Sequence, residues 1–324
     1  MVSTHKPHSG SMQFWPRKRA SRMYARIRSW KNRSKEVKLL GFPGYKVGMT
    51  HVFLKDENLN YKIKTIDISV PVTVIECPPI KILSTRYYSN SPYGLKLISE
   101  VFSKDLDKNL ERKIKRTKKT GKAPEEFDEV RLVVYTQPKI SGLGKKTPEI
   151  MEIGIGGDDV KAKEEFAKSL SGKEIRLSTI FKEGQLVDVH SVTSGKGFQG
   201  TVKRFGVKIR QHKAEKTKRG IGTLGAWTPT KVQYTVAQPG RMGFHLRTDY
   251  NKLVLKIGNN PEEINPEGAF LHYGLVKGDY ILIKGSVPGP VKRLITITEP
   301  SKQPVKFKQK STKIDYINTK SNQG

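Results

Sequence analysis

Short runs of alternating and β-branched residues recur along most of the chain, and each predicts a strand. The runs cover residues 41–54, 65–83, 129–137, 186–206, 252–258, 280–287 and 293–300. Glycine and proline punctuate them, and the 186–206 run holds a Gly-rich turn between two predicted strands. At least seven short strands with few helices between them favour a closed or nearly closed antiparallel barrel.

Two segments carry helical patterns. Residues 104–122 place Leu106, Leu110 and Ile114 four apart, which predicts a short basic helix whose cations would suit either solvent or RNA. Residues 151–170 predict a strand ending in glycines, followed by a helix capped by Asp158 or Asp159. The glycines at 154–157 are not a nucleotide-binding loop, because the last glycine of that motif is missing and Asp158 stands where a phosphate needs free amides.

Charge adds a second feature to this β pattern. The chain has 61 Lys and Arg against 30 Asp and Glu, a formal charge of +31, so its expected partner is a polyanion, above all nucleic acid. A membrane-surface protein is the obvious rival, but no apolar run is long enough to span a bilayer and the N-terminus has no signal-peptide core. We therefore expect a cytoplasmic protein with a compact body and basic arms.

The cations are concentrated in three segments. Residues 1–38 hold eleven Lys and Arg and one acid, with Trp15, Tyr24 and Trp30 among them, a mixture that suits RNA phosphates and stacked bases better than it suits a solubilising tail. Residues 196–219 hold nine Lys and Arg and one acid, followed by an almost uncharged stretch ending at Trp227. The C-terminal strip 302–324 holds six Lys and one acid.

No pattern indicates an enzyme, a cofactor or a metal site. The single cysteine, Cys77, lies in a strand run without a basic activator beside it, so we expect a small buried core residue. The histidines are scattered, and His245 lies between Arg241 and Arg247, which favours a hydrogen-bonded residue packed on RNA over a catalytic base. A DNA-compacting protein is the other rival, but long Gly-rich basic arms with aromatics suit irregular RNA better than a DNA groove.

Five blocks of sequence resemble, in order, the family numbered third among the proteins of the large ribosomal subunit. They read PRKRASRMYARIRSW (16–30), LLGFPGYKVGMTHV (39–52), PVTVIECPPIKI (71–82), SGKGFQGTVKRFG (194–206) and GAWTPTKVQYTVAQPGRMGFHLRT (225–248). The resemblance covers nearly the whole chain. The long basic N-terminal arm and an insertion between about 100 and 170 make the chain similar to the archaeal and eukaryotic branch.

The resemblance implies a mostly β fold with an α/β insertion: a six-stranded translation-protein-type β-barrel with long basic RNA-binding extensions. It implies a structural and assembly role in the large subunit, contact with its 23S-type RNA and neighbouring ribosomal proteins, and no membrane or small-molecule substrate. The expected parts are a basic N-terminal extension, the start of the barrel, the insertion, the barrel continued, a basic internal loop, the barrel completed, and a basic tail. Their bounds are 1–38, 39–100, 101–175, 176–202, 203–235, 236–300 and 301–324.

In that family an internal loop ends in a tryptophan finger near the peptidyl-transferase centre, and the resemblance maps this residue to Trp227, supporting accommodation of tRNA in the A site. Read from the residues alone, Trp227 either stacks on RNA or plugs the loop onto the body. Lys218 stands where eukaryotic relatives have a histidine, so a histidine modification does not carry over, and the chain has GAWTP where they have GAWHP. The expected RNA-binding residues are Arg17, Lys18, Arg19, Arg22, Arg26, Arg28, Lys196, Lys203, Arg204, Lys208, Arg210, Lys213, Lys216, Lys218, Arg219, Trp227, Arg241, His245 and Arg247.

Overall fold

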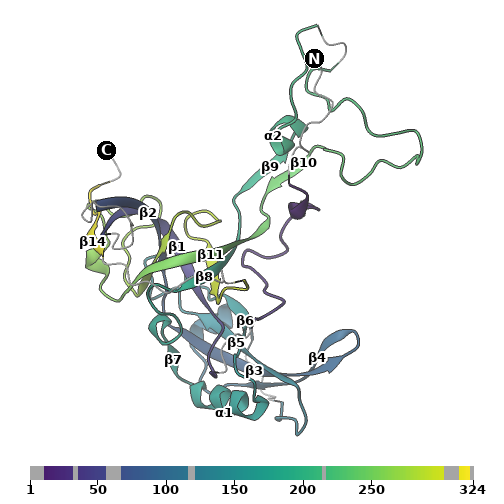
Figure 1. Cartoon of the computed structure of the whole chain (residues 1–324). Helices are drawn as coiled ribbons and strands as arrows, with labels where there is room; N and C mark the ends of the chain where they lie inside the picture. The colour runs from purple at the N-terminus through teal and green to yellow at the C-terminus, as the bar shows by residue number, and fades with distance from the viewer. Residues whose placement is uncertain are drawn as a thin grey trace, which may run out of the picture. The chain divides into compact units, whose positions relative to one another are not determined.

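The computed structural model describes residues 11–31, 36–55, 67–115, 121–213, 217–302 and 314–321. The chain divides into two compact units. Unit 1 consists of Met1–Met23 and Val192–Arg247, and unit 2 consists of Tyr24–Ser191 and Thr248–Gly324. Unit 2 is mostly β, as the alternating pattern predicts, whereas the described part of unit 1 has few strand residues and is mostly irregular (Figure 1).

Six strands close into a ring, whose order is β13-β8-β11-β12-β2-β1. The first residues of β1 pair antiparallel with β13, for example Gly41 with Thr298, and this pairing closes the ring. The far end of β1 carries a further antiparallel strand, β14. The bounds are β1 (Gly41–Lys55), β2 (Asp67–Glu76), β8 (Leu186–Val192), β11 (Leu246–Gly258), β12 (Tyr280–Lys284), β13 (Leu294–Thr298) and β14 (Ile314–Ile317).

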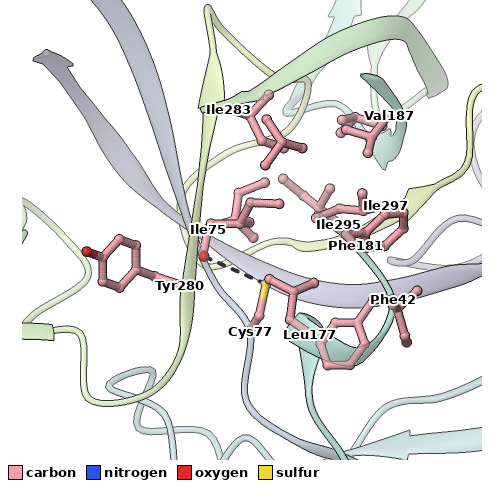
Figure 2. Packing of buried hydrophobic residues seen from close by; sticks show 14 of the residues in the cluster. Phe42, Ile75, Cys77, Leu177, Phe181, Val187, Tyr280, Ile283, Ile295 and Ile297 are labelled. Atoms are coloured by element: carbon pink, nitrogen blue, oxygen red, sulfur yellow. Dashed lines mark hydrogen bonds between the residues drawn. The ribbon is translucent and has the colours of Figure 1, made fainter. Parts of the chain in front are cut away.

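The ring encloses an apolar core of β-branched and aromatic side chains. Phe42, Ile75, Val187 and Ile297 are fully buried there, because alternate residues of each strand face inward (Figure 2). Cys77 lies in the same core with its Sγ 3.7 Å from the carbonyl oxygen of Ile75. Burial raises the pKa of the Cys77 thiol, so the prediction of an inert core cysteine is confirmed.

A second sheet follows β2 in the chain and has the order β4-β3-β5-β6, with β7 pairing on β3. Its strands are β3 (Ile80–Ser91), β4 (Gly94–Phe102), β5 (Glu129–Thr136), β6 (Ile150–Gly154) and β7 (Glu174–Ile175). Helix α1 (Val160–Leu170) follows β6 and begins as predicted: the Asp159 side chain accepts a hydrogen bond from the Lys161 amide at 3.1 Å. This sheet and α1 together form an α/β layer in unit 2.

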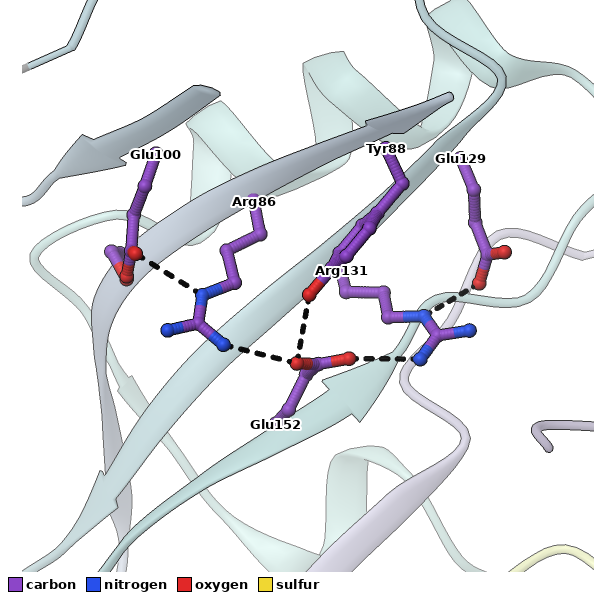
Figure 3. A network of polar contacts seen from close by, with 7 residues as sticks. Arg86, Tyr88, Glu100, Glu129, Arg131 and Glu152 are labelled. Carbon is purple, nitrogen blue, oxygen red and sulfur yellow. Dashed lines mark hydrogen bonds and ion pairs between the residues drawn. The ribbon is translucent and has the colours of Figure 1, made fainter. Parts of the chain in front are cut away.

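A polar network ties three strands of this sheet together (Figure 3). Arg86 of β3 and Arg131 of β5 are directly paired residues, which would repel each other if left alone. Glu152 of β6 accepts from Arg131 at 2.8 Å, from Tyr88 at 3.0 Å and from Arg86 at 3.2 Å, and Arg131 also pairs with Glu129 at 2.7 Å. The carboxylate between the two guanidinium groups converts a repulsive pair into a crosslink.

Three local predictions need correction. The 104–122 segment contains a 3₁₀ helix over Lys108–Arg112 and no α-helix among its described residues, which exclude 116–120. Residues Thr201–Phe205 form a short helix, α2, where the sequence predicts a strand, because Gly206 adopts a left-handed conformation and its amide closes the last turn onto Val202. The C-terminal strip contains β14, since pairing with β1 supplies backbone partners that no local pattern reveals. The other 3₁₀ helices are Met12–Phe14, Leu177–Thr179 and Pro261–Glu263.

Trp30 corrects the expectation for the N-terminal aromatics. Its indole packs against the core of unit 2, where a Cβ added at Gly154 would lie 2.6 Å from the ring and one at Gly41 would lie 3.0 Å from it. The two glycines therefore provide the surface on which the ring sits. Trp30 is therefore a packing residue of unit 2.

Candidate nucleic-acid interface

Unit 1 is the cationic part of the molecule. Its described residues include fifteen Lys and Arg and no Asp or Glu. In the same described residues only Val192 and Phe205 are buried hydrophobic side chains. With so few buried side chains and a surface of one charge sign, unit 1 gains little free energy from folding alone. Such a surface is suited to binding a polyanion.

The frame of unit 1 is a two-stranded antiparallel sheet and a short helix. Strand β9 (Gly195–Gln199) pairs with β10 (Gly240–Gly243), and α2 follows β9 directly. The basic loop that leaves α2 bends back on itself, since the Arg210 amide donates to the Lys218 carbonyl at 3.0 Å and the Thr201 hydroxyl donates to the Arg219 carbonyl at 3.3 Å. Lysines and arginines of the loop are thereby brought close to the helix.

The N-terminal segment packs on this frame through aromatic rings. The centroid of Trp15 lies 5.1 Å from that of Phe205 and 6.2 Å from that of Tyr234. Further along, the Ala20 amide donates to the Phe244 carbonyl at 2.8 Å. Two segments that are far apart in sequence therefore form one basic unit.

Three arginines of unit 1 are held in place by the protein itself. The Arg17 guanidinium lies 4.0 Å from the centroid of the Phe205 ring and donates to the Arg204 carbonyl. Arg204 donates to the carbonyl oxygens of Arg241 at 3.1 Å and Gln238 at 2.7 Å. Arg247 lies 4.7 Å from the centroid of Phe14.

The pKa values of these arginines and of His245 are lowered by burial and by neighbouring positive charges. Burial lowers the pKa of Arg17, and burial together with the charge of Arg17 lowers the pKa of Arg204 and of Arg247. Burial also lowers the pKa of His245, with a further lowering by Arg247, Arg204 and Arg17. The Nδ1–H of His245 donates to the Lys18 carbonyl at 2.6 Å, so this ring is a hydrogen-bonded structural group, as the sequence predicts.

The other expected contact residues are solvent-exposed. Arg26 and Arg28 lie in unit 2, both exposed, and Lys216 lies outside the described residues. Among the expected residues, the exposed cations of unit 1 are Lys18, Arg19, Arg22, Lys196, Lys203, Lys208, Arg210, Lys213, Lys218, Arg219 and Arg241, and Lys231 is exposed as well.

Trp227 is the most isolated large side chain of the basic loop. It is 89% exposed, and Gly225 before it has a φ of +134°, a conformation that L residues rarely adopt. The indole therefore points outward and is not packed in the core of unit 1, whereas stacking on RNA stays a prediction.

Sequence reasoning missed the aromatic supports of the arginines. Phe14, Phe205 and Phe244 carry no charge, yet they lie against Arg247, Arg17 and Arg19 respectively. The only sequence signal for them is the interleaving of aromatics with cations, which extends to phenylalanine as well as to tryptophan and tyrosine. Which ring faces which guanidinium depends on the pairing of β9 with β10 and is not encoded locally.

The described residues show no cluster of side chains suited to metal binding. No three His, Cys, Asp or Glu side chains gather among them in a way that could hold a metal ion. Both ring nitrogens of His190 are engaged, with the hydroxyls of Thr248 at 2.9 Å and Thr298 at 3.1 Å. In the part of the chain that is described, no helix has the length and apolar character needed to cross a membrane.

Comparison with known proteins decides the family. The family model for ribosomal protein L3 matches residues 1–126 and 117–324. The chain belongs to the ribosomal protein L3 family. The large ribosomal subunit protein uL3 of Methanobrevibacter smithii is 44% identical over the full length of both chains. The uL3 of Archaeoglobus fulgidus is 46% identical over 99% of each chain, and that of Methanocaldococcus jannaschii is 44% identical over all of this chain and 99% of its own.

Family membership confirms the resemblance read from the five sequence blocks. The L3-family chain is a component of the large ribosomal subunit and a structural ribosomal protein, not an enzyme. The archaeal origin of these relatives agrees with the predicted branch.

Proposed function

We propose that this L3-family chain binds large-subunit ribosomal RNA directly, mainly through unit 1, and supports assembly of the subunit. One observation carries the proposal: fifteen cations and no acid among the described residues of unit 1, on a core of two buried hydrophobic side chains. Phosphates would neutralise the cations, and RNA would supply the contacts that the thin core lacks. The residues we assign to RNA contact are those expected from the sequence, including Lys216 and the unit 2 arginines Arg26 and Arg28.

The loop that carries Trp227 extends toward the peptidyl-transferase centre and supports accommodation of tRNA in the A site. Two observations support this assignment: the position of Trp227 in the family pattern, and the 89% exposure of an indole flanked by Gly225. An exposed tryptophan of a loop is available for stacking on a base, which contributes about 1–3 kcal/mol.

The six-strand ring is proposed to be a translation-protein-type barrel that anchors the basic extensions. Its antiparallel closure of β1 on β13 supports that assignment. The domain bounds expected from the sequence remain our division of the chain, although the sheet of β3 to β7 spans one of them, with β3 and most of β4 before residue 101 and β5 to β7 within 101–175. Neighbouring large-subunit proteins are the expected protein partners.

Sedimentation tests the proposal. Tagged chain from cells should co-migrate with the large subunit after a high-salt wash, and crosslinking should join unit 1 peptides to the large-subunit RNA. A Trp227→Ala variant should enter subunits to the same extent but slow aminoacyl-tRNA accommodation. Release of the wild-type chain into the free fraction in high salt, or crosslinks confined to unit 2, would contradict the assignment.

A further inference from the structure

Unit 1 contains an open pocket of about 290 Å³ beside the arginine group. Its polar lining comes from Arg17, Thr193, Ser194, Lys196, Arg204, His245 and Arg247. No Asp or Glu belongs to the lining, so four cationic side chains face one space without a counter-ion from the described residues. The volume is several times the roughly 30 Å³ that a water molecule occupies in the liquid, so a small anion with some water fits.

The donors around this pocket are held by contacts within the folded unit 1. The Arg204 side chain is tied to the carbonyl groups of Gln238 and Arg241, and the Arg17 guanidinium lies on the Phe205 ring. The Arg247 guanidinium lies on the Phe14 ring. Once unit 1 is folded, donors held in this way lose little further side-chain entropy when an anion binds. These cations are therefore arranged for a ligand instead of being spread over a flexible surface.

The backbone leaves one wall of the pocket without a side chain. Gly243 has a φ of +75°, and a Cβ there would lie 2.0 Å from the Ser194 carbonyl oxygen, so only glycine allows β10 to approach residue 194 so closely. The Thr193 amide and the His245 carbonyl hold the same crossing at 2.9 Å. The pocket is thus a product of the fold and not of loose side chains.

We propose that this pocket binds a single phosphate group of large-subunit RNA. This proposal rests on the RNA-binding function proposed above and specifies one contact of it. Guanidinium groups from three separate segments can each donate a remaining N–H to a different oxygen of one tetrahedral phosphate. The bound charge would offset the mutual repulsion of Arg17, Arg204 and Arg247. One RNA phosphate would then fasten the N-terminal segment to the frame formed by β9 and β10.

A carboxylate introduced at the rim tests the pocket without risking the fold. The Ser194 side chain is exposed, and Ser194→Asp places an anion beside the cations. The probe is inorganic phosphate, compared with chloride at matched ionic strength, and the readout is amide exchange of unit 1 peptides in the full chain. Phosphate at ten times its Kd should slow exchange of wild-type β9 and β10 about tenfold. Ser194→Asp should already be protected in chloride and should gain almost nothing from phosphate.

Thr223→Asp is the matched control, because it adds the same charge to an exposed loop position of unit 1 outside the pocket lining. It should keep the full response to phosphate. Equal responses in the wild type and in both variants would mean nonspecific ion binding and would overturn the proposal.

Measuring the binding of a large-subunit RNA transcript distinguishes an RNA phosphate from free phosphate as the ligand of the pocket. At fixed ionic strength, inorganic phosphate should compete with RNA for the wild type and for Thr223→Asp but not for Ser194→Asp, whose salt slope should be lower by about 1. Phosphate protection without competition would assign the pocket to a free anion and reject the RNA ligand. Unchanged RNA binding by Ser194→Asp would reject the pocket while leaving the general RNA-binding function standing, whereas no RNA binding by the wild type would reject that function itself.

Discussion

At the scale of single residues, the surroundings of each tryptophan determine whether its ring packs within the protein or is exposed to solvent. Trp30 sits on two glycines of unit 2 and packs on the core, Trp15 packs against Phe205 and Tyr234, and Trp227 contacts solvent over most of its surface. The three residues look alike in a sequence of basic segments. Only the exposed position of Trp227 agrees with the function expected for it, because the partners of the other two come from distant strands and loops.

Alanine substitutions at Trp30 and Trp227 should have opposite effects on stability. Trp30→Ala removes core contacts and leaves a space over Gly154, so the free energy of unfolding should fall by about 2–4 kcal/mol. Trp227→Ala removes an exposed ring and should change it by less than about 0.5 kcal/mol. Urea unfolding of both variants, followed by far-ultraviolet circular dichroism, provides the comparison. A loss of several kcal/mol in Trp227→Ala would place this ring in the core and remove the finger assignment.

At the scale of elements, the sequence is most informative where the pattern is long. The strands at 41–55, 129–136, 186–192 and 294–298 follow directly from alternation and β-branching. The sequence does not predict helix α2, because five residues are too few to show a helical period. It does not predict β14 either, because this strand forms only by pairing with β1. The closing of β1 on β13 joins residues about 250 apart, a pairing that strand count suggests but cannot specify.

The Glu152 crosslink should make the α/β layer sensitive to acid. Burial alone would raise the pKa of Glu152, but hydrogen bonds from Arg131 and Tyr88 and the charges of Arg131 and Arg86 outweigh it, so the pKa is lowered from its ordinary value of 4.5. A lowered folded-state pKa gives stability that is complete above the unfolded-state pKa and is lost as pH falls through the folded-state pKa. Wild type should therefore exceed Glu152→Gln in unfolding free energy most at neutral pH.

The difference between the two proteins should shrink as pH falls below about 4.5, because protonated glutamate resembles glutamine. Urea titrations at several pH values from 7 to 3 measure it. Glu165→Gln, an exposed position of α1, is the control and should show no comparable change with pH. A wild-type advantage that is constant over this range would mean that the network contributes no charge-dependent stability.

At the scale of the whole molecule, the apolar core and the cationic surface without acidic residues belong to different units. Unit 2 contains nearly all of the buried hydrophobic residues, whereas the described part of unit 1 contains two and carries fifteen cations without an acid. Ordering the backbone costs about 1–2 kcal/mol per residue, and so few buried side chains cannot offset that for unit 1. RNA must supply the remaining free energy.

Amide exchange should therefore separate the two units. In the free protein, peptides from residues 11–23 and 196–235 should exchange quickly, while β2, β12 and β13 in the ring should be protected. Large-subunit RNA should slow exchange in the first two segments and leave the ring strands unchanged. Strong protection of both basic segments without RNA would show that unit 1 folds independently and that its charge is tolerated without a partner.

The salt dependence of RNA binding should report how many of these cations are engaged. Each neutralised phosphate contributes about −0.7 to −0.9 to the slope of log K against log salt, so about seven contacts, half of the unit 1 cations, would give a slope near −5 to −6. Replacing Lys208, Lys213 and Lys218 of the basic loop with glutamine should reduce the steepness by about 2 to 3. The same change at Lys161, Lys163 and Lys173 in and after α1 of unit 2 removes equal charge and should leave the slope unchanged. An equal reduction of the salt slope in the two triple variants would show that RNA binding depends on the total charge of the protein and not on contacts with unit 1. The two sets of lysines contribute identically to the net charge, so only a direct contact with RNA can make their effects on the slope differ.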